Sequence, residues 1–370
     1  MAWPVLLMAS ALDAGGSERQ IGEIAKALDR SRFEPHVGCF RPEGMRAHEL
    51  EMAGVPIVHF PVHSFASWSA VSAVFSLARY IHRHKIRLIH TFDYPLTVFA
   101  VPIGRFFTSA VVVSSQRSHR DLIPPRYRPL VHMTDHLVDA IVVNCNFVRR
   151  HLEREQHVPA SRIRLCYNAI NLKTFCPANG PMAAILPRDC FVIGTVSVLR
   201  PEKGLSTLLH AFAQVRHLRP EMKLAIVGDG SILESLKSEA RALGIYEDCV
   251  FAGSRAEVTE WLSALDIFVL PSLSEALSNS LMEAMACGCP VVASNVGGNP
   301  ELVQHGETGL LFEPGDAASL SGMLRRLIEN QQLRQRLADA GSECIRRNFS
   351  IAKAAQRMGE IYAQLIEPQG

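Results

Sequence analysis

The stretch DIFVLPSLSEALSNSLMEAMACGCPVVA (residues 266–293) contains two short apolar runs separated by an amphipathic segment. The runs at 266–270 and 290–293 have the length and composition of buried strands, and 279–287 has helical periodicity. A strand, a helix and a second strand in this order predict a βαβ unit with parallel strands. The segment 271–278 then follows the carboxyl end of a strand, where open α/β sheets bind ligands.

Two carboxylates stand out in this unit. Glu275 falls in the loop, and Glu283 falls about one turn into the helix, which Ser278 or Asn279 can cap. A ligand there would meet free backbone N–H groups and two carboxylates that accept hydrogen bonds from hydroxyls. A phosphate joined to a polyol is the matching chemistry. The alternative, for any pair of glutamates, is a surface loop residue and an acid on an exposed helix face.

Short apolar runs alternate with amphipathic segments in both halves of the chain, which predicts an α/β fold with parallel sheets. In the first half we expect strands at 5–10, 35–40, 55–60, 86–90, 110–114, 140–143 and 162–166, with helical stretches between them such as 17–28 and 68–84. In the second half we expect further strands at 191–199, 223–228 and 249–252, with helices at 205–215, 232–243, 257–265 and 353–365.

Residues 176–189 (CPANGPMAAILPRD) contain three prolines and a glycine without periodicity, and are the best candidate linker. We therefore expect one domain at 1–178 and a second at 188–352. The segment 353–370 is expected to pack back on the first domain. Two doubly wound, Rossmann-like domains joined in this way would face each other across a cleft.

Two further loops have residues that suit an anion. Gly15 and Gly16 stand between a strand and a helix, where glycine lets the backbone turn tightly, and Ser17 is a plausible N-cap. The full G-x-G-x-x-G spacing is missing, so NAD binding is weakly supported. Arg200 and Lys203 flank a helix start and form a natural diphosphate clamp. The alternatives are an ordinary turn and a solvated charged turn.

The composition excludes several classes of protein. A chain of 370 residues with 48% apolar residues and a net charge of +2 is not disordered, collagen-like or disulfide-stapled. Residues 1–180 carry 21 Lys/Arg and 14 Asp/Glu, a net charge of +7, which leaves −5 for the remainder. No nucleic-acid partner is expected, because neither interleaved aromatic residues nor a known motif accompanies the basic residues.

The cysteines and the N-terminus predict a cytoplasmic location. The nine cysteines form no CxxC pair and lie mostly among apolar residues, as in a reducing compartment. No span approaches the ~20 apolar residues of a transmembrane helix. The N-terminal apolar run lacks a basic region, so we expect a buried first strand rather than a signal peptide. The inner face of the cytoplasmic membrane is the other location considered.

The two-glutamate stretch resembles the signature of the retaining glycosyltransferase family 4, whose members have the GT-B architecture of two facing Rossmann-like domains. The resemblance extends over nearly the whole chain. Further segments that resemble the family, in family order, are 15–19, 142–152, 162–171, 227–230, 251–253, 296–301 and 305–312.

The resemblance implies a role for individual residues. Glu283 matches the glutamate that holds the nucleotide ribose, Glu275 the one that contacts the donor sugar, and Lys203 the diphosphate-binding lysine. The backbone at 277–280 resembles the loop that lies against sugar and phosphate. The other donor-binding residues that the resemblance implies are Gly15, Gly16, Arg200, Gly253, Leu277, Ser278, Asn279 and Ser280.

The chain departs from the family pattern at two functional positions. Val198 stands where the family usually has a phosphate-binding arginine, and Arg200 is the candidate substitute. Family members often have a histidine near the anomeric carbon, where a strict count gives Arg117 and His119 comes two residues later. Both are therefore candidate catalytic residues, together with Glu275. A surface loop histidine is the alternative for His119.

The resemblance implies a metal-independent transfer, with retention, of a hexose or N-acetylhexosamine. The donor would be a UDP- or GDP-linked sugar and the acceptor a glycan or lipid-linked glycan, in bacterial polysaccharide or glycolipid synthesis. No cofactor is expected, and the chain has no D-x-D cluster for a metal. The alternatives are a catalytically weak nucleotide-sugar-binding scaffold or regulatory protein and, less supported, an NAD-dependent enzyme.

The basic first half is expected to contact the acceptor and an anionic membrane surface. Its cations form two clusters, Arg79, Arg83, Lys85 and Arg87, and Arg117, Arg120, Arg126 and Arg128. Such clusters attract anionic lipid headgroups and lipid diphosphates. The alternative is a solvated basic face.

Overall fold

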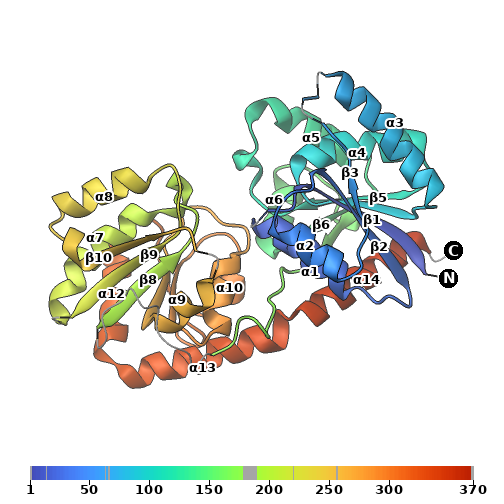
Figure 1. Ribbon diagram of the computed structural model, residues 1–370. Helices are drawn as coiled ribbons and strands as arrows, with labels where there is room; N and C mark the ends of the chain where they lie inside the picture. Colours follow the sequence, from blue (N-terminus) through green and yellow to red (C-terminus); the bar gives the residue numbers. More distant parts are fainter. Residues whose placement is uncertain are drawn as a thin grey trace. The chain divides into compact units, whose positions relative to one another are not determined.

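The computed structural model describes residues 2–13, 15–62, 64–65, 67–177, 190–219, 221–255 and 257–367. The chain divides into two compact units, residues 1–169 with 351–370 and residues 170–350 (Figure 1). Each unit contains one parallel sheet, and this confirms the predicted α/β fold with two Rossmann-like domains.

The first unit contains a seven-stranded sheet in the order β3-β2-β1-β4-β5-β6-β7. The order runs outward in both directions from the neighbours β1 and β4, so the topological switch point lies at their carboxyl ends. The strands are β1 (Trp3–Ala11), β2 (Phe33–Arg41), β3 (Ile57–His59), β4 (Leu88–Thr91), β5 (Val111–Gln116), β6 (Ala140–Val143) and β7 (Ile163–Leu165).

Helices cover both faces of this sheet. They are α1 (Gly16–Ala27), α2 (Met45–Met52), α3 (Trp68–Arg83), α4 (Tyr94–Phe107), α5 (Arg128–Asp135), α6 (Asn146–Arg154) and α14 (Ile351–Ile366). Side chains alternate along β1, so that Val5 and Leu7 pack in the core with α1 and α14. Leu6 and Met8 pack in the core with α3 and α4 on the other face.

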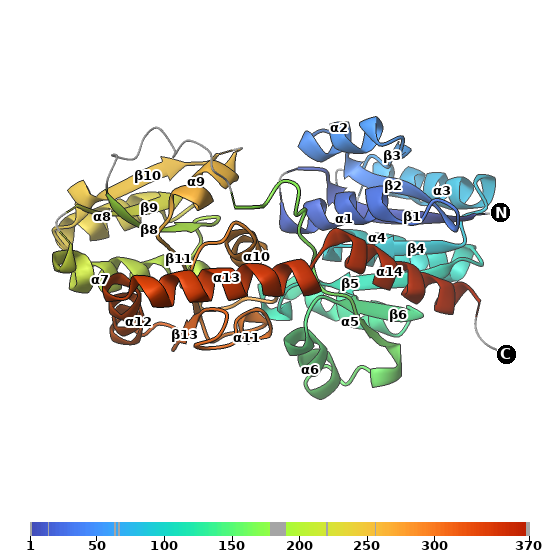
Figure 2. The same ribbon diagram turned by 90° about the horizontal axis from the view of Figure 1, so that it is seen from below.

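The C-terminal helix α14 belongs to the first unit and contacts α1, as Figure 2 shows. Tyr362 is fully buried, and its hydroxyl lies 2.6 Å from Nδ1 of His90 at the end of the sheet. The other ring nitrogen of His90 lies 2.8 Å from the hydroxyl of Ser115. A neutral imidazole can make both contacts, because one ring nitrogen donates a hydrogen bond and the other accepts one.

We expect His90 to make the first unit less stable in acid. Burial, and secondly the charge of Arg117, holds the pKa of His90 well below its ordinary value. The unfolded chain therefore binds this proton at a higher pH than the folded chain, and stability falls as the pH drops below about 6.5, by about 1 kcal/mol per pH unit. Urea unfolding between pH 7.5 and 5.5 should show a smaller loss for His90→Gln; an equal loss contradicts this prediction.

The second unit contains a six-stranded parallel sheet in the order β10-β9-β8-β11-β12-β13. The strands are β8 (Phe191–Val196), β9 (Met222–Val227), β10 (Cys249–Gly253), β11 (Ile267–Leu270), β12 (Val291–Ser294) and β13 (Leu310–Phe312). The helices are α7 (Leu205–Val215), α8 (Leu233–Ala242), α9 (Val258–Ala264), α10 (Asn279–Ala286), α11 (Asn299–Leu302), α12 (Ala317–Glu329) and α13 (Gln331–Asn348). Buried side chains of α7 and α12 contribute to its core.

The structure differs from the sequence-based expectations in several elements. Strand β13 and helices α2, α4, α5, α6, α11, α12 and α13 lie outside the ranges that the sequence predicts by number. Helix α4 is hidden in the sequence because Pro102 lies inside it and it is apolar on most sides. The division between the units falls at 169/170 rather than at 178, and Ile170 pairs with Ser350 in the second unit. Most of the expected linker, 178–189, lies outside the described residues.

Among the described residues, no helix is both long enough and apolar enough to cross a lipid bilayer.

Candidate functional site

The loop after β11 forms the centre of the candidate site in the second unit. Strand β11 ends at Leu270, and α10 begins at Asn279. Ser278 is the N-cap of α10, because its hydroxyl accepts a hydrogen bond from the backbone N–H of Leu281 at 3.3 Å. Of the two caps that the sequence allowed, the structure therefore selects Ser278. Its hydroxyl also lies 3.2 Å from that of Ser280.

Lys203 and Glu275, which are 72 residues apart, meet at this loop. Lys203 lies in the short 3-10 turn Pro201–Lys203 after β8, and its Nζ is 2.5 Å from Oε1 of Glu275. Ser272 donates a hydrogen bond of 2.9 Å to the same oxygen. The two loops come together because β8 and β11 are neighbours in the sheet and both end at one edge.

Close backbone contacts fix the position of the Glu275 loop. Gly204 and Gly297 have φ angles of +61° and +58°. A Cβ atom at Gly297 would lie 1.9 Å from the carbonyl oxygen of Glu275, so no larger residue fits there without movement. The N–H of Leu273 donates to the carbonyl of Glu202 at 2.8 Å. These contacts hold the Lys203 and Glu275 loops against each other.

Polar residues that the sequence analysis missed support the same loop. Ser294 is buried at the end of β12 and donates a hydrogen bond of 2.6 Å to the carbonyl of Ser272. The side chain of Asn299, also buried, donates to the carbonyl of Ser294 at 3.0 Å. Asn299 could have been identified in the sequence from its place in the segment 296–301, which directly follows a strand.

The other donor-side residues of the second unit are less closely gathered. Glu283 is buried in α10 with 4% exposure, and Leu277 has 5%. Arg200 is exposed, with Nη1 at 4.0 Å from Oε1 of Glu202. Gly253 ends β10, which is two strands away from β8. The structure thus brings Lys203 and Glu275 into contact, whereas Gly253 lies at the end of β10, the outermost strand on one side of the sheet.

The glycine loop of the first unit has a different geometry from the one expected. Gly15, not Ser17, is the N-cap of α1, and Ser17 lies in the first turn. A Cβ atom on Gly15 would lie 2.2 Å from Oε2 of Glu18, so the carboxylate of Glu18 already lies against this helix start. Burial is the main reason that the pKa of Glu18 is raised. A ligand anion would have to displace this carboxylate from the glycine loop.

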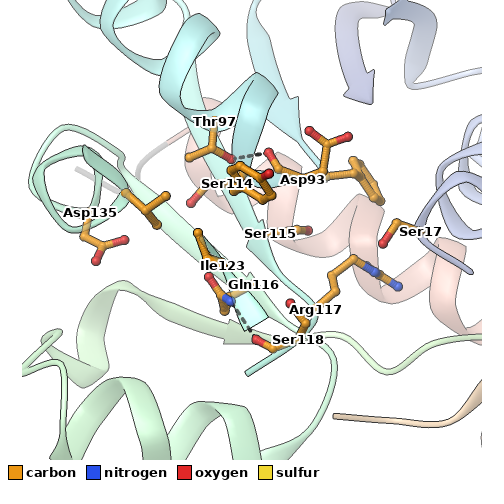
Figure 3. A pocket seen from close by; sticks show the side chains of 13 residues that line it. Ser17, Asp93, Thr97, Ser114, Ser115, Gln116, Arg117, Ser118, Ile123 and Asp135 are labelled. Carbon is orange, nitrogen blue, oxygen red and sulfur yellow. Dashed lines mark hydrogen bonds between the residues drawn. The ribbon is translucent and has the colours of Figure 1, made fainter. Parts of the chain in front are cut away.

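A pocket lies at the carboxyl ends of β4 and β5 in the first unit. Figure 3 shows Ser17, Asp93, Ser115 and Arg117 around it. The guanidinium of Arg117 lies 2.5 Å from Oδ1 of Asn168 and 5.4 Å from the centre of the Phe92 ring. Burial lowers the pKa of Arg117 to about 10. Arg117 thus remains a cation at neutral pH and lines the pocket.

Asp93 is a pocket residue that the sequence analysis missed. Its carboxylate caps α4 by accepting from the N–H of Leu96 at 3.0 Å, and it accepts from the hydroxyl of Ser10 at 2.8 Å. Burial raises its pKa, although these hydrogen bonds favour the charged form. An aspartate between an apolar strand and a proline, as in Phe92-Asp93-Tyr94-Pro95, was the available signal.

His119 is not among the residues that line this pocket. It caps the 3-10 turn Arg120–Leu122, where its Nδ1 lies 3.4 Å from the backbone nitrogen of Asp121. Its ring lies 4.1 Å from the ring of His151, centre to centre, and 6.0 Å from that of Phe147. Of the two residues proposed for the acceptor side, only Arg117 therefore reaches the pocket.

Known proteins resemble both units. The family model described as Glycosyltransferase Family 4 matches residues 14–174, and the one described as Glycosyl transferases group 1 matches residues 184–343. The crystal structure of Anabaena HepE in complex with UDP and glucose aligns with a TM-score of 0.85 and 24% identity, over 97% of this chain and 99% of that one. At this identity the likeness shows a shared fold, the GT-B fold.

Two curated relatives are bacterial enzymes. The N-acetyl-alpha-D-glucosaminyl L-malate synthase of Bacillus anthracis is 30% identical over 171 residues, which are 46% of this chain and 45% of that protein. The UDP-Gal:alpha-D-GlcNAc-diphosphoundecaprenol alpha-1,3-galactosyltransferase of Escherichia coli is 28% identical over 221 residues, 58% and 57% of the two chains. The chain spans about half the length of the curated relatives it matches. Because a family model matches each of its two units, the chain belongs to glycosyltransferase family 4.

Proposed function

We propose that the protein transfers a hexose or N-acetylhexosamine from a nucleotide-diphosphate sugar to a glycan or lipid-linked acceptor, with retention of the anomeric configuration. The observation that supports this most is the contact between Lys203 and Glu275 at the sheet edge of the second unit, in a chain of this family. A cation that faces a diphosphate and a carboxylate that faces sugar hydroxyls are the two groups that such a donor requires.

Each donor-side residue has a proposed partner on the donor. Lys203 contacts the diphosphate, and Arg200 is exposed and adds a second cation. Glu275 accepts hydrogen bonds from the sugar hydroxyls, and Glu283 from the ribose. The first N–H groups of α10, at Asn279 and Ser280, add the partial positive charge of a helix start.

The proposed reaction breaks the bond from the anomeric carbon to the diphosphate oxygen and forms a bond from the same face to the acceptor oxygen. The acceptor proton passes to the departing phosphate oxygen. Charge develops on the diphosphate as the bond breaks, and fixed cations stabilise this charge most in the transition state. Lys203 supplies this stabilisation, and the proposed transfer step uses no metal.

Product analysis tests this function. Incubation with a panel of UDP- and GDP-linked sugars and candidate acceptors should release free nucleoside diphosphate with one donor, and the NMR coupling constant of the product should show a retained anomeric configuration. An inverted product would contradict retention. Donor binding without turnover over the whole panel would favour the alternative, a nucleotide-sugar-binding scaffold protein.

A contact with an anionic membrane is proposed for the first unit. Trp68 and Phe75 lie two turns apart on α3 and are 88% and 63% exposed, and Phe106 and Phe107 are exposed at the end of α4. The exposed Arg79 lies on the same helix. Aromatic side chains beside basic residues are typical of protein surfaces that enter a lipid headgroup layer. The acceptor of the E. coli relative, by its name, is linked to diphosphoundecaprenol.

We expect the double variant Trp68→Ala/Phe75→Ala to bind phosphatidylglycerol vesicles about tenfold more weakly. The reason is that two aromatic side chains are no longer available to transfer from water into the membrane. Vesicle sedimentation at low salt measures this. Met52→Ala is the matched control, since Met52 is 77% exposed on α2. Equal binding of the double variant, or no preference of the unchanged protein for anionic over neutral vesicles, would contradict the membrane contact.

A further inference from the structure

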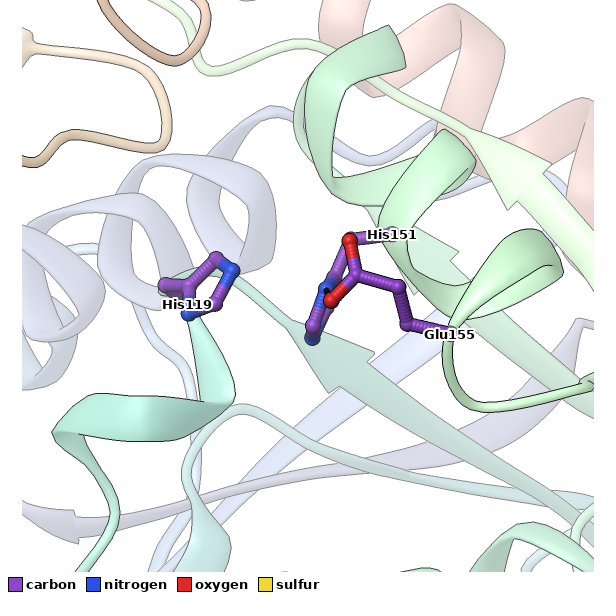
Figure 4. Close-up of side chains that lie close together, drawn as sticks. All are labelled: His119, His151 and Glu155. Carbon is purple, nitrogen blue, oxygen red and sulfur yellow. Dashed lines mark ion pairs between the residues drawn. The ribbon is translucent and has the colours of Figure 1, made fainter.

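Three metal-ligating side chains meet in the first unit outside the pocket. His119 follows β5, and His151 and Glu155 lie one turn apart at the end of α6. One ligand atom from each residue lies within 4.8 Å of the other two. Figure 4 shows the two imidazole rings beside each other and the carboxylate of Glu155 next to the ring of His151.

His151 is a buried imidazole without a hydrogen bond. It has 5% exposure, and neither Nδ1 nor Nε2 makes a hydrogen bond to any described residue. Its Nδ1 lies 3.0 Å from Oε2 of Glu155, but this is a charge contact rather than a hydrogen bond of good geometry. Buried polar atoms nearly always have a partner, because leaving one unsatisfied costs about 1–3 kcal/mol.

An ion pair alone explains the cluster poorly. The contact of His151 with Glu155 is not a hydrogen bond of good geometry. An ion pair with Glu155 also does not involve His119, whose ring centre lies 4.1 Å from that of His151. A divalent cation bound between the three residues would instead give His151 a partner and draw on all three side chains.

We propose that His119, His151 and Glu155 bind a zinc ion. Two imidazole nitrogens and one carboxylate oxygen, with a fourth position left to water, are a ligand set that zinc takes in proteins. Residues at i and i+4 lie on the same face of a helix, so His151 and Glu155 can bind one ion. Tetrahedral zinc needs ligand atoms about 3.3 Å apart, and Oε2 of Glu155 and Nδ1 of His151 are 3.0 Å apart.

The zinc ion would connect the end of α6 with the loop that leaves β5, and residues 114–118, at the end of β5 and in this loop, line the pocket. His119 lies two residues after Arg117, on the loop that leaves β5, whereas His151 and Glu155 lie at the end of α6. The ion therefore fixes the loop that carries Arg117. The proposed role of the ion is to hold these two segments together, and it leaves the proposed metal-free transfer step unchanged. It also gives His119 a role other than that of a catalytic residue.

Zinc binding by the full chain tests the proposal without any donor or acceptor. The protein is first stripped of metal with a chelator, and the chelator is removed. When zinc is then added, the protein should retain one equivalent of it through gel filtration. Cobalt in place of zinc should give the visible absorption of a tetrahedral site. Glu155→Gln should weaken zinc binding about tenfold or more, because one charged ligand is lost. Glu153→Gln is the control, since Glu153 lies on the same helix and pairs with Arg149 instead.

A second variant distinguishes loss of zinc binding from loss of folding. His151→Ala removes a buried side chain and can lower stability by itself, so His119→Asn, at a partly exposed position, is the variant to compare. His119→Asn should also lose the tetrahedral cobalt spectrum while it keeps the unfolding temperature of the zinc-free protein. The proposal is overturned if the unchanged protein retains no zinc, or if Glu155→Gln and His119→Asn bind it as well as Glu153→Gln does. Because no sugar is present, failure of the proposed transferase activity would not affect this result.

Discussion

Replacing Lys203 with Met is expected to lower kcat by about 100- to 1,000-fold, the loss typical when one group that stabilises transition-state charge is removed. Methionine keeps most of the apolar stem of the side chain and removes only the ammonium group. The same change leaves Glu275, which has 10% exposure, without its cation. An unpaired carboxylate would then repel the diphosphate. Both effects act on turnover, which is measured as release of nucleoside diphosphate.

The double variant Lys203→Met/Glu275→Gln separates these two effects. If repulsion by Glu275 were the main cause, the second change would restore much of the activity. If the positive charge on Lys203 is what matters, as we expect, the double variant stays at least as inactive as the single one. Lys237→Met is the matched control, because Lys237 also pairs with a glutamate, Glu234, at 2.8 Å and its exposure of 25% is close to the 24% of Lys203. Normal kcat in Lys203→Met would exclude the proposed role.

The contact between Lys203 and Glu275 was predictable in outline from the sequence. Each residue follows a short apolar run, and parallel strands end at the same edge of a sheet. What the sequence could not supply is that β8 and β11 are neighbours, which depends on the strand order. Family resemblance placed the two residues in one site, and the sheet explains physically why they meet.

The acceptor side was less predictable because its residues lie on irregular backbone. Arg117 and His119 are two residues apart, but only Arg117 lines the pocket, since the chain turns into a 3-10 segment after His119. The sequence does not predict Asp93 as a site residue because Asp93 caps α4, and Pro102 argues against a helix in that segment. Side-chain direction in such loops follows from local hydrogen bonds, and periodicity gives no information about these.

The position of the Glu18 carboxylate beside Gly15 shows the same limit. Two glycines before a helix suit an anion site, with an ordinary turn as the alternative. The structure instead has a carboxylate of the chain itself against that helix start. A pattern of residue types predicts that a loop can bind an anion. It does not reveal that a carboxylate of the same chain already lies there.

Glu283 is expected to be the main contact of the protein with the ribose of the donor nucleotide. It is buried at 4% exposure in the helix that Ser278 caps. A hydrogen bond from a hydroxyl to a charged carboxylate contributes about 1.5–3 kcal/mol, so Glu283→Gln should weaken nucleoside diphosphate binding about 10- to 100-fold, and Glu283→Ala should abolish it in calorimetry.

A deoxy nucleotide makes this test specific to the ribose. The unchanged protein should bind the 2′-deoxy or the 3′-deoxy form of the nucleoside diphosphate more weakly than the normal form. Glu283→Gln should discriminate much less between them, because the charged acceptor is already gone. If the variant loses affinity but still discriminates as strongly as the unchanged protein, Glu283 acts on the fold of the loop rather than on the ribose. A lowered unfolding temperature would accompany that outcome, since Glu283 is buried and its neighbours would have to rearrange.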